Sequence, residues 1–354
     1  MSTDERKPSS TIPTAERVAF LRDPNSYPGD VRHVETRETR MSWVFLTRER
    51  VYKLKKPIRD RWLDLTTPEA RERNAREEVR LNRRLAPDVY IGTARLTVGA
   101  GGELAIDGAG ESIDWLVVMR RLPDERMLDR LIIENRVHPE EIETLASRLM
   151  AFYRDCAPAA LTVDEHLALF REQQRLNRDV LAHPRVAPEL DRAAAALDTM
   201  DRFLTDETDL LATRVHGGHI VEGHGDLRAE HVCLEPTPVV IDCLEFNRAL
   251  RLVDPFDEIT DLALECRRLG AHWIGTLLLD RCVAALGERP PGRLLDFYTV
   301  MRACLRARLA IRHLLEPDPR TPERWLPLAR EYLAVADTAC LRLRAPRADR
   351  PATR

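Results

Sequence analysis

The sequence predicts an α+β protein in which a smaller β-rich part precedes a larger helical part. Two observations support this fold class. Short β-prone runs separated by polar or glycine-rich turns fill most of residues 31–119, and helical periodicity dominates from residue 125 onward except over 220–246. Strands followed by a long run of helices are typical of α+β folds, because segregated elements pack as a sheet beside helices.

Composition and charge narrow the class of protein. The chain has 354 residues, of which 44% are hydrophobic and 32% charged. This is ordinary for a folded globular protein with two or three structural units. A net charge of −3 is not the basic excess that drives nucleic-acid binding. No apolar run approaches the ~20 residues of a membrane span, and the amino terminus lacks the apolar core of a signal peptide.

Seven scattered cysteines without a CxxC pair argue against a disulfide framework or a thiolate zinc site. We therefore predict a cytoplasmic protein that binds neither nucleic acid nor membrane. The sequence does not indicate its oligomeric state.

The amino-terminal elements follow from local patterns. An extension over 1–30 is expected to be loose at first and to contain a short helix. The segment Thr66-Thr67-Pro68-Glu69 is a helix start, with a capping threonine and a proline in the first turn, and its helix should end near Leu85. Strands are expected over these ranges: 43–46, 51–54, 92–98, 103–106 and 113–119. The last includes WLVVM, the most apolar run, which is predicted to be a central strand.

The carboxyl-terminal part, over 120–344, is predicted to be mainly helical. Helices are expected over these ranges: 139–155, 163–182, 188–210, 255–269, 271–286, 293–315 and 322–343. The interruption at 220–246 has the pattern of a loop, a strand, a turn and a second strand. Residues 345–354 are expected to be disordered.

The strongest chemical signal lies in that interruption. Asp226 is in the loop HGD, His231 begins the first short strand, and Asp242 ends the second. Two carboxylates at the ends of paired strands suit phosphoryl transfer, in which one group accepts the proton of the substrate hydroxyl and another holds the metal on the nucleotide. The structural alternative is that Asp226 caps a turn and Asp242 ends a strand.

The segments HGDLRAEHVCL and VVIDCLEFN resemble the aminoglycoside phosphotransferase family, a branch of the protein-kinase-like fold. They are most similar to a bacterial subgroup whose longer members add a carboxyl-terminal P-loop ATP-binding domain. The likeness extends through VFLTRERVYKLKKP and EEVRLNRRLAPDVY and covers roughly residues 33–310. No GxxxxGK[ST] motif occurs, so the resemblance implies the phosphotransferase half alone, with a nucleotide-binding amino-terminal lobe over 31–119.

The resemblance implies roles for the 224–231 and 239–246 segments. Asp226 matches the catalytic-loop aspartate, and His224 would support its loop. Asp242 matches the metal-binding aspartate. His231 stands where the family usually has a metal-binding asparagine, and Glu245 would be a further metal contact or a surface residue. Because nitrogen suits Mg²⁺ less well than oxygen does, Mn²⁺ becomes a possible partner besides Mg²⁺.

The lysines have a corresponding role. Only four of the 55 basic residues are lysine, and three of them lie in KLKK. In this fold a strand lysine binds the ATP phosphates and pairs with a glutamate of the next helix. Strand alternation puts Lys53 and Lys55 on one face and Lys56 on the other, and Lys53 is the first choice. Helical periodicity puts Glu78, but not Glu77, on the packed face, so Glu78 is the predicted partner.

Other assignments rest on position alone. The glycine-free segment VETRETRMSW would cover the phosphates with Thr39, Ser42 and backbone amides. Val118, Met119 and Arg120 match the linker where backbone groups would meet adenine, with a plain core strand as the alternative.

Five further residues lie on predicted helices. Asp254 is expected to cap a helix and Asp261 to brace the catalytic loop. Arg302, Arg306 and Arg308 form either a solvated face or a substrate contact.

Three hypotheses follow. The leading one is an ATP-dependent kinase that transfers the γ-phosphate to a hydroxyl of a sugar, amino sugar or aminoglycoside-like acceptor. The second is a non-catalytic nucleotide-binding module, which the departure at His231 allows. The third is a histidine metal site built from His216, His219, His224 and His231, although no helix fixes the spacing of these residues.

Overall fold

A computed structural model describes residues 12–346 of the chain. It divides into two compact units, the first comprising Met1–Pro123 with Ile241–Asn247 and the second Asp124–Val240 with Arg248–Arg354. The sequence interpretation had placed 239–246 wholly with the helical part, whereas Ile241–Asn247 packs with the sheet. The expectations for residues 1–11, and for most of the tail at 345–354, lie outside the described residues.

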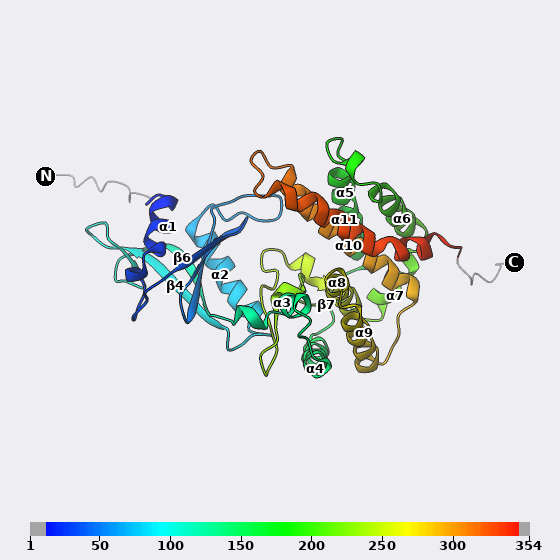
Figure 1. The fold of residues 1–354 in the computed structure, drawn as a ribbon, viewed down its shortest axis with the longest axis horizontal. Coiled ribbons are helices and arrows are strands. Elements are labelled where there is room, and N and C mark those ends of the chain that lie inside the picture. Colours follow the sequence, from blue (N-terminus) through cyan, green and yellow to red (C-terminus); the bar gives the residue numbers. More distant parts are fainter. Residues whose placement is uncertain (1–11, 347–354) are drawn as a thin grey trace. The chain divides into compact units, whose positions relative to one another are not determined.

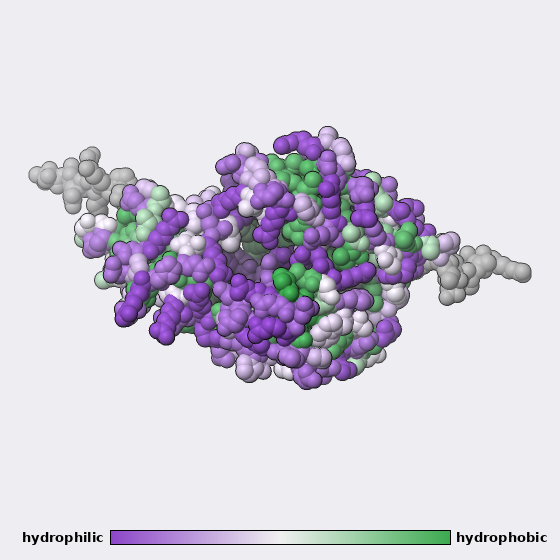
Figure 2. All heavy atoms as spheres, in the orientation of Figure 1, coloured by the Kyte–Doolittle hydropathy of each residue, from purple (hydrophilic) through white to green (hydrophobic). Residues whose placement is uncertain are grey.

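The first unit is built on a six-stranded antiparallel sheet with the order β1-β2-β3-β6-β4-β5. Its strands are β1 (Glu35–Glu38), β2 (Ser42–Leu46), β3 (Arg50–Lys55), β4 (Tyr90–Val98), β5 (Leu104–Ile106) and β6 (Glu111–Arg120). The WLVVM run lies in β6, between β3 and β4, so its prediction as a central strand is confirmed. Hydrophilic residues cover most of the face of this unit that is visible in Figure 2.

Two helices complete the first unit (Figure 1). Helix α2 (Pro68–Asn82) packs on β6 and β4, and Thr67, not Thr66, caps it by accepting a hydrogen bond from the Ala70 amide. Helix α1 (Thr14–Arg22) contributes Leu21 to a core with sheet residues. The predicted extension is therefore partly an element of this unit's core.

The second unit is mainly helical. Its helices are α3 (Leu128–Ile133), α4 (Pro139–Asp155), α5 (Val163–Leu181), α6 (Ala193–Asp206), α7 (Thr208–His216), α8 (Pro255–Arg268), α9 (His272–Leu286), α10 (Gly292–Leu314) and α11 (Pro322–Arg344). The last four were predicted to within one residue at each end. In Figure 1, α10 and α11 run side by side.

Two helix predictions need correction. The single helix expected over 188–210 is broken at Glu207, where φ is −129°, into α6 and α7. The Glu207 carboxylate there forms an ion pair with Arg293 of α10. Helix α3 was not predicted, because six residues are too few to show helical periodicity.

Two small antiparallel pairs interrupt the helices. Strand β8 (Val232–Cys233) pairs with β9 (Val239–Val240), which confirms the predicted hairpin. Strand β7 (Val221–Glu222) pairs with β10 (Leu252–Val253), a pairing that was not predicted. The α+β fold class is therefore confirmed, with a small antiparallel sheet unit and a larger helical unit.

Within residues 12–346, no helix is both long enough and apolar enough to cross a membrane.

Candidate active site

The predicted lysine–glutamate ion pair is present in the first unit. Strand β3 lies between β2 and β6, and its Lys53 side chain reaches Glu78 on α2. The Lys53 Nζ lies 2.9 Å from Glu78 Oε1 and 2.7 Å from Asp242 Oδ1. The ammonium thus joins the sheet, the helix and the 241–247 segment at one point.

Lys55 extends this cluster. Lys55 is almost fully buried, and its ammonium forms ion pairs with both Glu78 and Glu245. Glu245 was expected to be a metal contact or a surface residue, but its side chain is only 9% exposed and is held by Lys55. Two lysines therefore face three carboxylates, which leaves one net negative charge in the cluster.

The backbone around Asp242 is held by side chains of the same unit. The Asp242 amide donates to the Tyr90 hydroxyl at 3.1 Å, and the Cys243 amide donates to Asn82 Oδ1 at 2.9 Å. Asp242 itself has a φ of 60°, in the left-handed region that non-glycine residues rarely adopt. A strained backbone held by several contacts is common at functional sites.

Electrostatics keeps the cluster charged. Burial alone would lower the pKa of Lys53, but the nearby carboxylates of Asp242, Glu78 and Glu245 raise this pKa well above its ordinary value. Burial would likewise raise the pKa of Glu78, and the ammonium groups of Lys53 and Lys55 lower it overall. Lys53 and Glu78 therefore stay ionised near neutral pH.

Thr39 and Ser42 do not form an open phosphate loop. The Thr39 hydroxyl accepts a hydrogen bond from the Ser42 amide at 3.0 Å and donates one to the Ser42 carbonyl, which closes a turn. Ser42 is 1% exposed and belongs to β2. Four of the ten residues expected to cover the phosphates form strand β1.

The residues assigned to the linker belong to the sheet. Val118 and Met119 pair with both β3 and β4, and the Arg120 amide donates to the Val89 carbonyl at 2.8 Å. Val118 also packs in the core of the first unit. The boundary between the units falls after Pro123, and these three residues belong to strand β6 of the first unit.

The second unit contains the HGD loop. The Asp226 amide lies 3.3 Å from His224 Nδ1, and the Asp226 carbonyl lies 2.8 Å from His231 Nδ1. His224 is 1% exposed, in agreement with a supporting role. Because a carbonyl can only accept, His231 donates from Nδ1, and its neutral form carries the lone pair on Nε2.

The Asp226 carboxylate is held by Arg306 of α10. The Arg306 Nη1 lies 2.6 Å from Asp226 Oδ1, and its Nη2 lies 2.6 Å from Asp261 Oδ2 on α8. Burial would raise the pKa of Asp226, but the charges of Arg306, His231 and Arg228 lower it well below its usual range. Asp261 thus braces the loop through Arg306.

The arginines of α10 are neither a solvated face nor an open substrate contact. Arg302, Arg306 and Arg308 are each at most 8% exposed. Arg302 forms a bidentate pair with Asp257 at 2.8 and 2.6 Å. The i,i+4 spacing of Arg302 and Arg306 matches that of Asp257 and Asp261 on α8, so the two helices pair through their charged faces.

Glu258 is a loop-supporting residue that sequence reasoning missed. It is 1% exposed and accepts hydrogen bonds from the amides of His224 and Gly225, at 3.0 and 2.5 Å, and from the Tyr153 hydroxyl at 2.7 Å. A Cβ on Gly223 would lie 2.8 Å from Glu258 Oε2. The only signal in the sequence was its position four residues after the cap Asp254, whose predicted cap on Phe256 is confirmed.

The four histidines of the third hypothesis form no metal centre in the structure. His219 pairs with Glu288 at 3.1 Å, while His216 ends α7. In the described part of the chain, no group of three or more His, Cys, Asp or Glu side chains has the arrangement of a metal site.

Comparison with known proteins identified relatives in mycobacteria. The chain is 30% identical over 283 residues to the uncharacterized protein Rv2004c of Mycobacterium tuberculosis, and equally so to the uncharacterized protein Mb2027c of Mycobacterium bovis. The aligned segment covers 79% of this chain and 55% of each relative. The chain therefore spans about half the length of these relatives. A scan against models of known protein families found no match.

Solved structures with a related fold include a choline/ethanolamine kinase family protein and two phosphotransferases. A choline/ethanolamine kinase family protein of Mesorhizobium loti has a TM-score of 0.46 at 14% identity, covering 92% of this chain and 99% of its own. An aminoglycoside phosphotransferase of Streptomyces rimosus, solved with ADP and streptomycin, has a TM-score of 0.44 at 18% identity, covering 82% and 98%. An AMP-bound spectinomycin phosphotransferase has a TM-score of 0.46 at 10% identity, covering 91% and 97%.

Proposed function

We propose that this protein belongs to the aminoglycoside phosphotransferase family and is an ATP-dependent kinase for a small molecule with a hydroxyl group. The observation that carries the proposal is the position of Lys53 Nζ, within 2.9 Å of Glu78 and 2.7 Å of Asp242. A partly buried lysine fixed by two carboxylates is a point charge held in one place, as phosphate binding requires.

Asp226 is the proposed residue for the acceptor hydroxyl. Its carboxylate is held by Arg306, and its lowered pKa keeps it anionic. A strongly acidic carboxylate is a weak base but a good hydrogen-bond acceptor. Asp226 would therefore orient the hydroxyl for attack on the γ-phosphorus and take its proton only as the new P–O bond forms.

The donor set fits a divalent cation. Asp242 offers a carboxylate whose side chain is 46% exposed, in a cluster with one net negative charge. Carboxylate oxygen is the ligand that Mg²⁺ prefers, and the Nε2 of His231 would add a nitrogen ligand that Mn²⁺ tolerates better. Asp242 and His231 would hold the metal, which supplies charge neutralisation on the phosphates when bound.

The acceptor is proposed to be a sugar, an amino sugar or an aminoglycoside. A coupled assay of ADP release over a panel of these three classes, with Mg–ATP, tests the proposal. Purified Asp226→Asn protein should retain nucleotide binding and lose turnover by on the order of 10³-fold, because the hydroxyl is no longer oriented by a carboxylate.

Asp280→Asn is the matched control, since Asp280 is an exposed residue of α9. It should leave turnover unchanged. Equal turnover by wild-type and Asp226→Asn proteins would refute the role of Asp226, and the absence of ADP release and of nucleotide binding in the wild type would refute the kinase assignment. Thermal stabilisation by ATP without ADP release from any acceptor would favour the non-catalytic nucleotide-binding module.

A further inference from the structure

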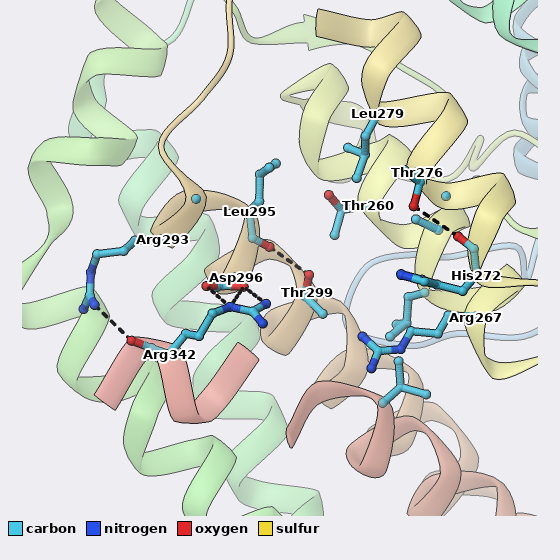
Figure 3. Close-up of a pocket in the computed structure, with 15 residues that line it drawn as sticks. Thr260, Arg267, His272, Thr276, Leu279, Arg293, Leu295, Asp296, Thr299 and Arg342 are labelled. Atoms are coloured by element: carbon cyan, nitrogen blue, oxygen red, sulfur yellow. Dashed lines mark hydrogen bonds and ion pairs between the residues drawn. The ribbon is translucent and has the colours of Figure 1, made fainter. Parts of the chain in front are cut away.

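A pocket of about 580 Å³, open to the surface, lies among helices α8, α9, α10 and α11 of the second unit (Figure 3). Its wall includes Thr260 and Arg267 from α8 and Leu295 from α10. The loop-supporting side chains Glu258, Asp261 and Arg306 are not part of this wall. The cavity is therefore separate from the contacts that hold the HGD loop.

Thr260 is the first sign that the cavity binds a ligand. It is 4% exposed, and its hydroxyl has no hydrogen-bond partner within residues 12–346. Figure 3 shows its side chain between Leu295 and Thr276 in the wall of the cavity. A buried hydroxyl without a partner costs free energy unless a bound molecule or water supplies one.

Comparison with other threonines inside helices shows that a hydroxyl without a hydrogen-bond partner, as in Thr260, is unusual in this protein. Six of them donate to the carbonyl four residues earlier, which is the ordinary solution for a threonine inside a helix. They are Thr144, Thr199, Thr205, Thr213, Thr276 and Thr299. Thr260 lies inside α8 as well, yet its hydroxyl does not donate to the Phe256 carbonyl. Its hydroxyl is therefore available to the cavity.

The charge of the wall indicates the kind of ligand. Three arginines and one carboxylate line the cavity, and the carboxylate of Asp296 is already paired with Arg342 at 2.9 Å. Arg267 and His272 are exposed, and their side chains form no hydrogen bond or ion pair within the described residues. In Figure 3 both side chains point from their helices toward α10. These two groups are donors for an anion.

We propose that this cavity is a second binding site, which takes a small organic anion carrying one phosphate or carboxylate group. The anionic group would contact Arg267 and His272, and a polar atom of the ligand would pair with the Thr260 hydroxyl. The apolar side chains of Leu279, Leu295 and Val335 would cover the rest of the molecule. This site is independent of the proposed transfer of phosphate.

Binding is measured on the full chain with two anionic probes, phenyl phosphate and benzoate, and with the cation benzylamine as a probe of similar size. Methyl NMR spectra of protein labelled at leucine and valine report on the cavity through Leu279, Leu295 and Val335. The anions should shift these signals in a saturable way, and benzylamine should not.

Two variants locate the site. Thr260→Val removes one hydroxyl with little change of shape and should weaken binding of phenyl phosphate roughly fivefold or more. Arg267→Gln removes the unpaired charge and should weaken it roughly tenfold or more. Lys53→Met should leave this binding unchanged, because Lys53 belongs to the candidate nucleotide site.

Equal response to benzylamine, no saturable shift with either anion, or anion binding that survives both cavity variants would overturn the proposal. Loss of binding only in Lys53→Met would assign the anion to the candidate nucleotide site and would also overturn it. None of these outcomes depends on ADP release, so the kinase assignment is tested separately.

Discussion

At position 53, a single ammonium nitrogen meets two carboxylates that come from a helix and from a distant segment of the chain. An arginine would place a planar fork in this space, and its charge would lie further from the strand. Lys53→Arg should therefore keep the fold but lower ATP turnover by roughly 100-fold, because the charge no longer stabilises the transferring phosphate. Steady-state kinetics with thermal unfolding of the same sample measures both effects.

Lys56→Arg is the control for this substitution. Lys56 lies three residues away, contacts Glu38 and lies 4.9 Å from the centre of the Trp43 ring, and arginine can make both contacts. Its turnover should equal that of the wild type. Similar losses in both variants would show that any change in KLKK disturbs the sheet, and the phosphate role of Lys53 would then lack support.

At the residue scale, some assignments could be predicted and others could not. The family resemblance implied a lysine–glutamate pair. Strand alternation left Lys53 or Lys55 as the lysine, and helical periodicity favoured Glu78 over Glu77, because these periods fix the face on which a side chain lies. The contacts of Lys55 with Glu245 and of Arg306 with Asp226 could not be predicted. These contacts join residues separated by 190 and 80 positions in the chain, and a local sequence pattern carries no information about contacts between such distant residues.

At the scale of elements, α8 and α10 pair through buried charges. Arg306 of α10 is 3% exposed and contacts Asp226 and Asp261. Arg306→Met would leave both carboxylates without this partner and should lower the free energy of unfolding by about 3–5 kcal/mol. Chemical denaturation followed by circular dichroism measures this change. Arg306→Lys keeps a positive charge, so it should lower the free energy of unfolding by less than Arg306→Met does.

Arg306→Met should also change the pH dependence of kcat/KM, which a purely structural role of Arg306 would not do. Arg306 lowers the pKa of Asp226, so in the wild type this carboxylate stays ionised well below pH 4. In Arg306→Met its pKa rises, and the acid limb of the kcat/KM profile should move to higher pH. Arg312→Met, an exposed change on the same helix, should leave the profile where it was. If the acid limb of the kcat/KM profile lies at the same pH in Arg306→Met as in the wild type, the positioning role of Arg306 is contradicted.

Helix ends were predicted well where caps and amphipathic periods coincide, as in α8 with its Asp254–Pro255 start. Strands β7 and β10 were not predicted to pair, because no short turn connects them as residues 234–238 connect β8 and β9. It also failed at Glu207, where a contact with Arg293 accompanies the break between α6 and α7.

At the scale of the whole molecule, the chain leaves the sheet unit after Pro123 and returns to it for only seven residues, Ile241–Asn247. That return supplies Asp242 and Glu245, the carboxylates that pair with Lys53 and Lys55. A fragment of residues 1–123 keeps both lysines and Glu78 but lacks two of the three opposing charges. It should unfold at markedly lower denaturant concentration than the sheet unit of the full chain, as hydrogen exchange at β3 would show.

The late return of Ile241–Asn247 also has a consequence during synthesis. At 5–20 residues per second, the ribosome needs roughly 6–25 seconds to add the chain between Pro123 and Asn247. During this time the sheet unit has both lysines and Glu78 but neither Asp242 nor Glu245, so the complete lysine–carboxylate cluster cannot form until Ile241–Asn247 has been made. The nascent chain is thereby kept from completing this cluster before the first part of the helical unit, Asp124–Val240, has been synthesised.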